Sequence, residues 1–95
     1  MKKNQEYLER AKKKVPGITQ LLSKRPDQFA PGTWPTYYSK AKGTEIWDLE
    51  GQQFLDMSIS GIGANILGYC DPDVDAAVIK AVTNCNSSSL NCPEE

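Results

Sequence analysis

The 95-residue sequence contains no histidine, so it lacks the side chain that most often serves as general base and metal ligand. Neither a Ser-His-Asp nor a Cys-His arrangement can be assembled from it. Its three cysteines are few, and Cys85 and Cys92 are too far apart in sequence for a zinc knuckle. We therefore predict no catalytic triad and no metal site.

Long apolar runs are also missing, so no membrane span is predicted. The start, Met1-Lys2-Lys3, is not followed by the apolar stretch of a secretory signal. An odd number of cysteines fits a reducing compartment better than a disulfide framework. These features together predict a cytoplasmic protein without a membrane partner.

Charge of one sign is not in excess, and a net charge of −1 argues against a nucleic-acid partner. The distribution is uneven, because residues 1–14 hold six of the eleven basic residues and two of the twelve acidic ones. A solvated basic helix is the favoured interpretation of this segment. Contact with a membrane surface or RNA is the alternative.

The first third of the sequence predicts one helix and an irregular arm. Residues 4–14 have apolar positions at helical spacing, and Pro16-Gly17 ends the pattern. Those positions are Tyr7, Leu8, Ala11 and Val15. Four prolines exclude a long regular element from residues 16–35, although this stretch is too apolar for a free linker. We treat residues 1–35 as an N-terminal helix and extended arm.

Residues 36–58 predict an antiparallel β-meander of three short strands, at 36–39, 44–47 and 52–57. Asp48 and Gly51 stand at the first and fourth positions of a type I turn between the last two. Ile46 and Trp47 are adjacent and would point to opposite faces of the sheet. Such a pattern indicates that both faces are at least partly covered.

A glycine-rich connection, residues 59–71, then leads into a second helix. Asp71 is a natural N-cap and Pro72 a natural first helical residue. An apolar stripe at helical spacing follows: Val74, Val78, Ala81 and Val82. The helix should fade near Asn84, and Pro93-Glu94-Glu95 is typical of another helix start. The sequence thus predicts an α+β fragment of helix, three-stranded meander, glycine-rich loop and helix.

The glycine-rich connection is the strongest candidate for a site. It matches neither the G-x-G-x-x-G nor the P-loop pattern, so a phosphate site made by this loop alone is disfavoured. One interpretation is structural, because glycine permits turns and close packing. The other is a pocket edge, in which Ile62 supplies an apolar wall and Asn65 holds the loop with its amide.

The remaining candidate groups have simpler structural interpretations. Asp48 begins a turn, Asp71 caps a helix, and Asp56 can accept backbone hydrogen bonds. A lysine that forms a Schiff base needs an environment that favours the neutral amine. None of the three lysines near the predicted turns and second helix lies in a pattern that predicts burial: Lys40, Lys42 and Lys80.

The order of these segments resembles the amino-terminal part of class III aminotransferases, which are fold-type I enzymes that use pyridoxal 5′-phosphate. Within them the chain is most similar to the glutamate-1-semialdehyde 2,1-aminomutase branch. The segments that carry the likeness are Lys40-Ala41-Lys42-Gly43, Ile46-Trp47-Asp48-Leu49-Glu50-Gly51, Phe54-Leu55-Asp56, Gly61-Ile62-Gly63-Ala64-Asn65-Ile66-Leu67-Gly68-Tyr69 and Asp71-Pro72-Asp73-Val74. Val15-Pro16-Gly17 and the segment Ser88 to Glu95 match that branch at the two ends.

Two departures from the family pattern stand out. Ser60-Gly61-Ile62-Gly63 replaces the Ser-Trp-Gly that is usual in the aminomutase, which puts mutase activity in question. Tyr69 and Asp71 stand where family members often have histidine. The choice between transaminase and aminomutase therefore stays open.

The resemblance implies that residues 36–95 form part of the small domain of an α/β transferase fold that depends on pyridoxal phosphate. The parent would be a homodimer that moves an amino group between an amino acid or amine and a keto acid or aldehyde. The likeness places five residues at the substrate: Ser60, Gly61, Ile62, Gly63 and Asn65. Ser88 and Ser89 are candidates near the cofactor or the dimer contact.

The same resemblance assigns no catalytic residue to this chain, because the family's cofactor lysine lies beyond residue 95. We therefore expect the chain alone to be inactive and not to hold the cofactor. The alternative is a non-catalytic, truncated interaction module that docks on a full-length partner.

Overall fold

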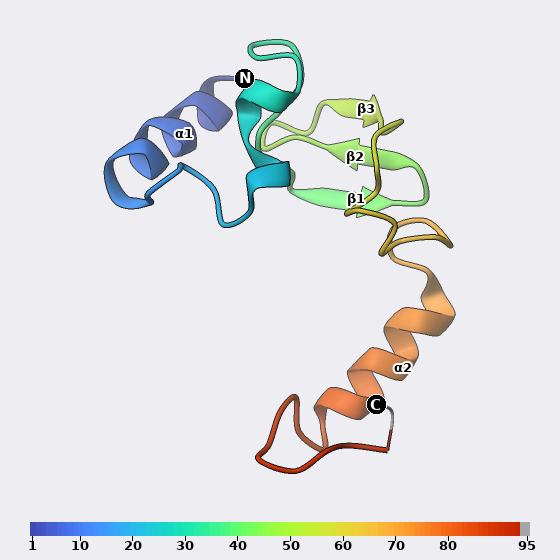
Figure 1. Cartoon of the computed structure of the whole chain (residues 1–95). Coiled ribbons are helices and arrows are strands. Elements are labelled where there is room, and N and C mark those ends of the chain that lie inside the picture. Colours follow the sequence, from blue (N-terminus) through green and yellow to red (C-terminus); the bar gives the residue numbers. More distant parts are fainter. Residues whose placement is uncertain (94–95) are drawn as a thin grey trace.

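The computed structural model describes residues 1–93 and contains two α-helices around a small sheet (Figure 1). The elements are α1 (Lys2–Lys14), η1 (Leu22–Lys24), η2 (Pro26–Gln28), β1 (Lys40–Lys42), β2 (Glu45–Trp47), β3 (Gln53–Leu55) and α2 (Pro72–Val82). The strands pair antiparallel in the order β1-β2-β3. The predicted α+β meander is confirmed, and the arm between α1 and β1 is irregular apart from the two short 3₁₀ turns.

One face of the sheet carries the small apolar core. Ile46 in β2 pairs with Ala41 on one side and Phe54 on the other, so all three share that face. Trp34 from the arm packs edge-on against Phe54, with ring centroids 5.6 Å apart. Ile46, at 8% exposure, is the one large apolar side chain that is buried in the described part of the chain.

The opposite face of the sheet is open. Trp47 is covered there by the Lys40 ammonium group, which lies 4.1 Å from the ring centroid, and Leu55 is exposed. The expectation that both faces are partly covered therefore holds for one face and is only weakly met on the other. Burial of the second face requires atoms that residues 1–93 do not supply.

The predicted strand at residues 36–39 is wrong, since the first strand is β1 at Lys40–Lys42. The reason is Asn4, which is buried in α1 and whose Oδ1 accepts the backbone N–H groups of Thr36 and Tyr37 at 2.8 and 3.1 Å. These donors bond to a helix side chain instead of a neighbouring strand. Helix α1 is also held by Glu50, whose Oε1 accepts the Lys3 N–H at 2.9 Å.

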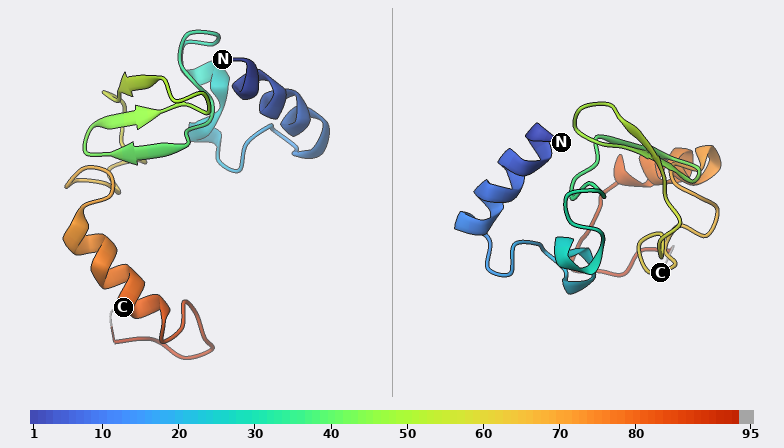
Figure 2. Two further views of the ribbon diagram at one scale, coloured as in Figure 1. Left: turned by 180° about the vertical axis from the view of Figure 1, so that it is seen from behind. Right: turned by 90° about the horizontal axis from the view of Figure 1, so that it is seen from above.

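The second helix begins as predicted. The Asp71 carboxylate accepts the N–H groups of Asp73 and Val74, each at 3.1 Å, and Pro72 is the first helical residue. Helix α2 extends away from the sheet, as Figure 1 and the left view of Figure 2 show, so its apolar stripe is exposed. The helix start predicted at Pro93-Glu94-Glu95 falls largely outside the described residues.

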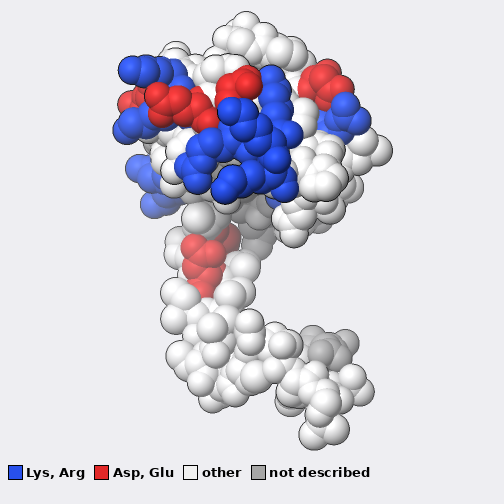
Figure 3. Space-filling model, turned by 90° about the vertical axis from the view of Figure 1, so that its left-hand side faces the viewer, with Lys and Arg blue, Asp and Glu red and all other residues white. Residues whose placement is uncertain are grey.

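The molecule is elongated, and its charge is segregated. Its radius of gyration is 15.9 Å, whereas a compact domain of this length has about 12 Å. On the face drawn in Figure 3, basic side chains gather over the upper part together with some acidic ones, and the lower part shows one acidic patch where α2 begins and little other charge. No helix among residues 1–93 combines the length and apolar character needed to cross a bilayer.

Candidate functional site

The loop between β3 and α2 (residues 56–71, the β3–α2 loop) is fixed at its base by a pair of backbone hydrogen bonds. The Gly43 N–H donates to the Tyr69 carbonyl at 2.8 Å, and the Tyr69 N–H donates to the Gly43 carbonyl at 2.9 Å. This bridge joins the loop to the β1–β2 turn. It also explains Gly68, because a Cβ there would lie 3.1 Å from the Gly43 backbone.

Within the loop, four consecutive residues have positive φ angles. Ser60, Gly61, Ile62 and Gly63 have φ of 46°, 69°, 61° and 75°, and we call this segment the left-handed turn. The Gly63 N–H donates to the Ile59 carbonyl at 2.8 Å across it. Left-handed φ costs a residue with a Cβ about 1–2 kcal/mol, and a β-branched residue such as Ile62 is a genuine outlier there. Backbone strain of this kind concentrates at functional sites.

Asn65 supports the left-handed turn directly. Its side-chain Nδ2 donates to the Ser60 carbonyl at 3.1 Å, so the amide holds the loop in the manner expected from the sequence. A Cβ on Gly61 would lie 3.1 Å from the same Nδ2, whereas a Cβ on Gly63 would meet nothing within 4 Å. Gly61 therefore makes room for the Asn65 hydrogen bond, and Gly63 is needed for its φ.

A carboxylate and a phenol close the ends of the β3–α2 loop. The Tyr69 hydroxyl donates to Asp56 Oδ2 at 2.6 Å, and the Ser58 N–H donates to Asp56 Oδ1 at 2.8 Å. Partial burial works to raise the pKa of Asp56, but the hydrogen bonds from Ser58 and Tyr69 outweigh it and lower the pKa overall. Burial, followed by the Asp56 carboxylate, raises the pKa of Tyr69. The pair is therefore a charge-assisted hydrogen bond from a neutral phenol to a carboxylate.

A shallow cavity of about 180 Å³ lies between this loop and the start of α2. Residues 64–68 line one side, and Val74 and Asp75 of the first helical turn line the other. Neither lysine nor arginine lines the cavity, and Asp71 and Asp75 add negative charge. The cavity can accept an apolar or amine-bearing group, and it is unsuited to a phosphate.

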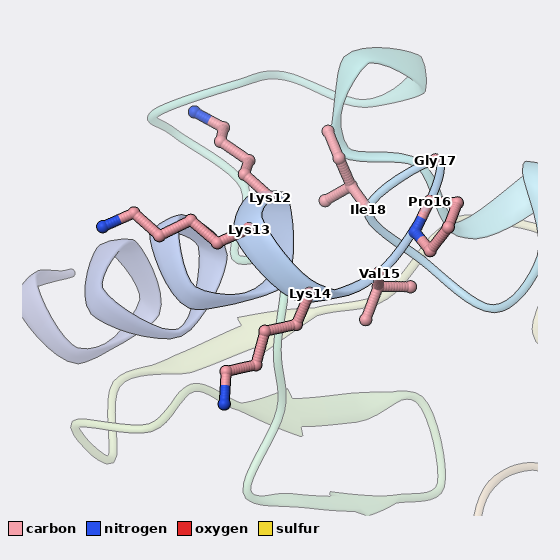
Figure 4. A pocket seen from close by; sticks show the side chains of 7 residues that line it. All are labelled: Lys12, Lys13, Lys14, Val15, Pro16, Gly17 and Ile18. Carbon is pink, nitrogen blue, oxygen red and sulfur yellow. The ribbon is translucent and has the colours of Figure 1, made fainter.

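A second hollow, of about 460 Å³, lies elsewhere and is formed by the bend that follows α1. It is lined by one continuous segment, residues 12–18 (Figure 4). The ammonium groups of Lys12, Lys13 and Lys14 point in different directions there and do not converge on a common point. We assign no ligand to this bend.

The structure separates the predicted site residues into two groups. The five predicted substrate residues are together in the β3–α2 loop, and their contact with a substrate stays a prediction. Ser88 and Ser89 follow α2 and lie at the far end of that helix from the loop (Figure 1). The Ser88 hydroxyl is engaged locally with the backbone of Leu90, at 2.9 Å from both N and O. Within one copy of residues 1–93, the two groups form no common site.

Two carboxylates behave as their sequence context indicates. Asp48 is 1% exposed and begins the turn, where its Oδ1 accepts the N–H groups of Glu50 and Gln52. Asp56 accepts the Ser58 N–H, as expected, and also the Tyr69 hydroxyl, which sequence reasoning missed. The Tyr69–Asp56 contact joins residues 13 positions apart. The one sequence signal for it is that Tyr69 stands where family members often have histidine.

Comparison with known proteins decides the family. The family described as "Aminotransferase class-III" matches residues 29–94, which is more than half of the chain. The chain belongs to the class III aminotransferase family. A 3-aminobutyryl-CoA aminotransferase of Cloacimonas acidaminovorans is 32% identical over 82 residues, covering 86% of this chain and 19% of that protein. A glutamate-1-semialdehyde 2,1-aminomutase of Leptothrix cholodnii is 39% identical over 92 residues, covering 97% and 20%.

A solved structure shares the fold. It is the FumI protein of Sphingopyxis sp. MTA144 in its PLP internal aldimine form, with a TM-score of 0.79 and 22% identity. The match covers 98% of this chain and 22% of that one. The resemblance to the N-terminal segment of a class III aminotransferase is therefore confirmed, and the chain spans about a fifth of the length of the relatives it matches.

Proposed function

We propose that this chain is the N-terminal segment of a dimeric, cytoplasmic aminotransferase or aminomutase. The complete protein would move an amino group between an amino acid or amine and a keto acid or aldehyde. The observation that carries the proposal is the class III match across residues 29–94, which includes the whole β3–α2 loop. In this arrangement residues 1–35 are a helix and arm, and residues 36–95 are part of the small domain.

The β3–α2 loop would form one edge of the substrate pocket. Its left-handed turn exposes the Ile62 side chain, and both Gly61 and Gly63 leave the backbone accessible. Hydrogen bonds from Asn65 and to Ile59 hold the turn, so an apolar wall there has a defined position. Preorganised geometry of this kind is what orienting a substrate requires.

The cofactor of the complete protein would be pyridoxal 5′-phosphate, which supplies the stabilisation of a substrate carbanion. The residues present here do not fit the group. In residues 1–93 on their own every lysine is exposed, whereas an imine-forming lysine must be desolvated or placed next to another cation, so these residues alone provide no such site. The cavity beside the β3–α2 loop also lacks a positive charge for the phosphate. We therefore assign the cofactor lysine to chain outside residues 1–95.

The exposed surface supports the view that residues 1–95 pack against further protein. The chain exposes 7673 Å², whereas a compact protein of 10.5 kDa exposes about 5,400 Å². The excess of about 2,200 Å² on this chain alone is more than twice the roughly 800 Å² that each partner contributes to a standard protein–protein interface. The apolar faces of α2 and the sheet would be buried by the remainder of the protein.

The same excess surface supports a second candidate, a non-catalytic module that docks on a full-length partner. The two candidates differ in whether the chain is translated with a downstream segment. An intact-mass measurement on the source protein separates them, since the first requires a mass about five times larger than 10.5 kDa, by the coverage of the relatives.

The functional test uses the full-length protein and pyridoxal phosphate. Adding an amino donor should change the absorption spectrum of the bound cofactor, and a keto acid or aldehyde acceptor should restore it. A full-length protein that binds the cofactor but shows neither change with a panel of amino acids and amines would overturn the proposed reaction.

A further inference from the structure

The β3–α2 loop is ordered by hydrogen bonds and has little apolar packing to hold it. Met57, Ile59, Ile62, Ile66 and Leu67 are all exposed, so the apolar side chains of the loop contribute little burial. The loop nevertheless contains the left-handed turn, and two of the four residues in that turn, Ser60 and Ile62, carry a Cβ and disfavour positive φ angles. Specific polar contacts must therefore offset that cost.

The hydrogen bonds from Asn65 to Ser60 and from Gly63 to Ile59 act within the left-handed turn, and one phenol acts on the segment that leads into it. The Tyr69 hydroxyl donates to Asp56 Oδ2 at 2.6 Å. The same carboxylate accepts the Ser58 N–H at 2.8 Å. One hydroxyl group thus connects the end of the loop to Asp56 at its start, and Asp56 in turn holds Ser58, two residues before the left-handed turn.

The backbone of Tyr69 is fixed independently of its side chain. Its N–H and carbonyl both pair with Gly43, at 2.9 and 2.8 Å, in the turn between β1 and β2. The phenol is therefore presented from a position that belongs to the sheet. Loss of the hydroxyl would release Asp56 while this backbone bridge stays in place.

We propose that Tyr69 is a positioning residue that, through Asp56 and the Ser58 N–H bound to it, holds the left-handed turn of residues 60–63 in one conformation. The proposal rests on the proposed function where it concerns substrate, because the positioned turn is the pocket edge. It does not rest on that function where it concerns the order of the turn. Tyr69 acts through its neighbours and is not itself placed against the reacting atoms.

The test uses the full-length protein and the variants Tyr69→Phe, Asp56→Asn and their combination. Tyr7→Phe is the matched control, because its phenol lies on α1 and makes a ring contact with Tyr37. Hydrogen exchange of the Gly63 amide, without substrate, reports the order of the turn. The ratio kcat/KM for an amino donor reports whether the turn is positioned for the substrate. The melting temperature shows whether the variant is destabilised as a whole.

We expect Tyr69→Phe to speed exchange at Gly63 about tenfold, which is the loss of one charge-assisted hydrogen bond. The ratio kcat/KM should fall ten- to a hundredfold, mainly through kcat, with an unchanged melting temperature. The double variant should lose little more than Tyr69→Phe, since the two groups act as one unit. Tyr7→Phe should change neither readout.

Three results would overturn the inference. Unchanged Gly63 exchange in Tyr69→Phe would show that the phenol does not order the turn. Faster exchange with unchanged kcat/KM would show that the order of the turn does not matter to the substrate. If the effects of Tyr69→Phe and Asp56→Asn on Gly63 exchange and kcat/KM simply add in the double variant, the two residues act independently of each other. Absence of any amino transfer by the unaltered protein would refute the proposed function instead, and the exchange measurement would still decide the role of Tyr69.

Discussion

Replacement of Ile62 by glycine should separate folding from function at the left-handed turn. Ile62 has a φ of 61°, which costs a β-branched residue about 1–2 kcal/mol that glycine does not lose. Glycine in turn loses about 0.5–1 kcal/mol through its greater freedom when unfolded. Ile62 is 67% exposed, so little burial is lost. The stability of the turn should therefore range from unchanged to about 1.5 kcal/mol greater.

The effect on activity should have the opposite sign. If Ile62 is the apolar wall of the pocket, its side chain becomes buried only when substrate is bound. Burial of an isoleucine side chain is worth about 1.5–3 kcal/mol, so kcat/KM should fall tenfold or more. Ile62→Gly would then be a variant that is at least as stable and clearly less active.

The assay measures Gly63 amide exchange and kcat/KM on the full-length protein, with Ile66→Gly as the matched control. Ile66 lies in the same loop at 90% exposure and does not have a positive φ. Its replacement should only add unfolded-state freedom and destabilise the loop by about 0.5–1 kcal/mol. The reasoning is refuted if Ile62→Gly speeds exchange as much as Ile66→Gly does. Unaltered kcat/KM in Ile62→Gly would reduce the loop to a structural connection.

Three further predictions follow from individual contacts. Gly61→Ala should destabilise the turn more than Gly63→Ala, because only the first adds a Cβ 3.1 Å from Asn65 Nδ2; comparative Gly63 exchange detects the difference, and equal effects would contradict it. Asn4→Ala should cost about 1–3 kcal/mol, since two backbone N–H groups lose their acceptor, whereas a shift in melting temperature below one degree would refute this role. Because the pKa of Asp56 is lowered in the folded protein, its carboxylate stabilises the loop fully while it is ionised, and this stabilisation is lost as the pH falls through the folded-state pKa. Gly63 exchange, corrected for intrinsic rates, should therefore accelerate on acidification. An exchange rate that does not change with pH would contradict the prediction.

Local signals in the sequence were sufficient where neighbouring residues determine the structure. The Asp71-Pro72 pair predicts the start of α2, because both the cap and the fixed φ act within one turn. Asp48 predicts the turn between β2 and β3 for the same reason, and the Gly51 N–H closes it onto the Asp48 carbonyl at 3.2 Å. The family resemblance likewise depends on the order of such local segments.

Contacts between distant residues could not be predicted. Asn4 bonds to backbone groups more than thirty positions away, and this contact displaced the first strand from residues 36–39 to β1. Glu50 supports the start of α1 from a turn 47 positions along the chain. The left-handed φ of Ile62 also has no signal in its own residue type, because isoleucine disfavours that region.

The most direct test of the account locates the cofactor lysine. The full-length protein is loaded with pyridoxal phosphate, reduced with borohydride and digested, and the labelled peptide is identified by mass spectrometry. We expect one stoichiometric adduct on a lysine outside residues 1–95, with only scattered labelling of the exposed lysines inside this range. A stoichiometric adduct on any lysine within residues 1–95, or no adduct at all, would contradict it.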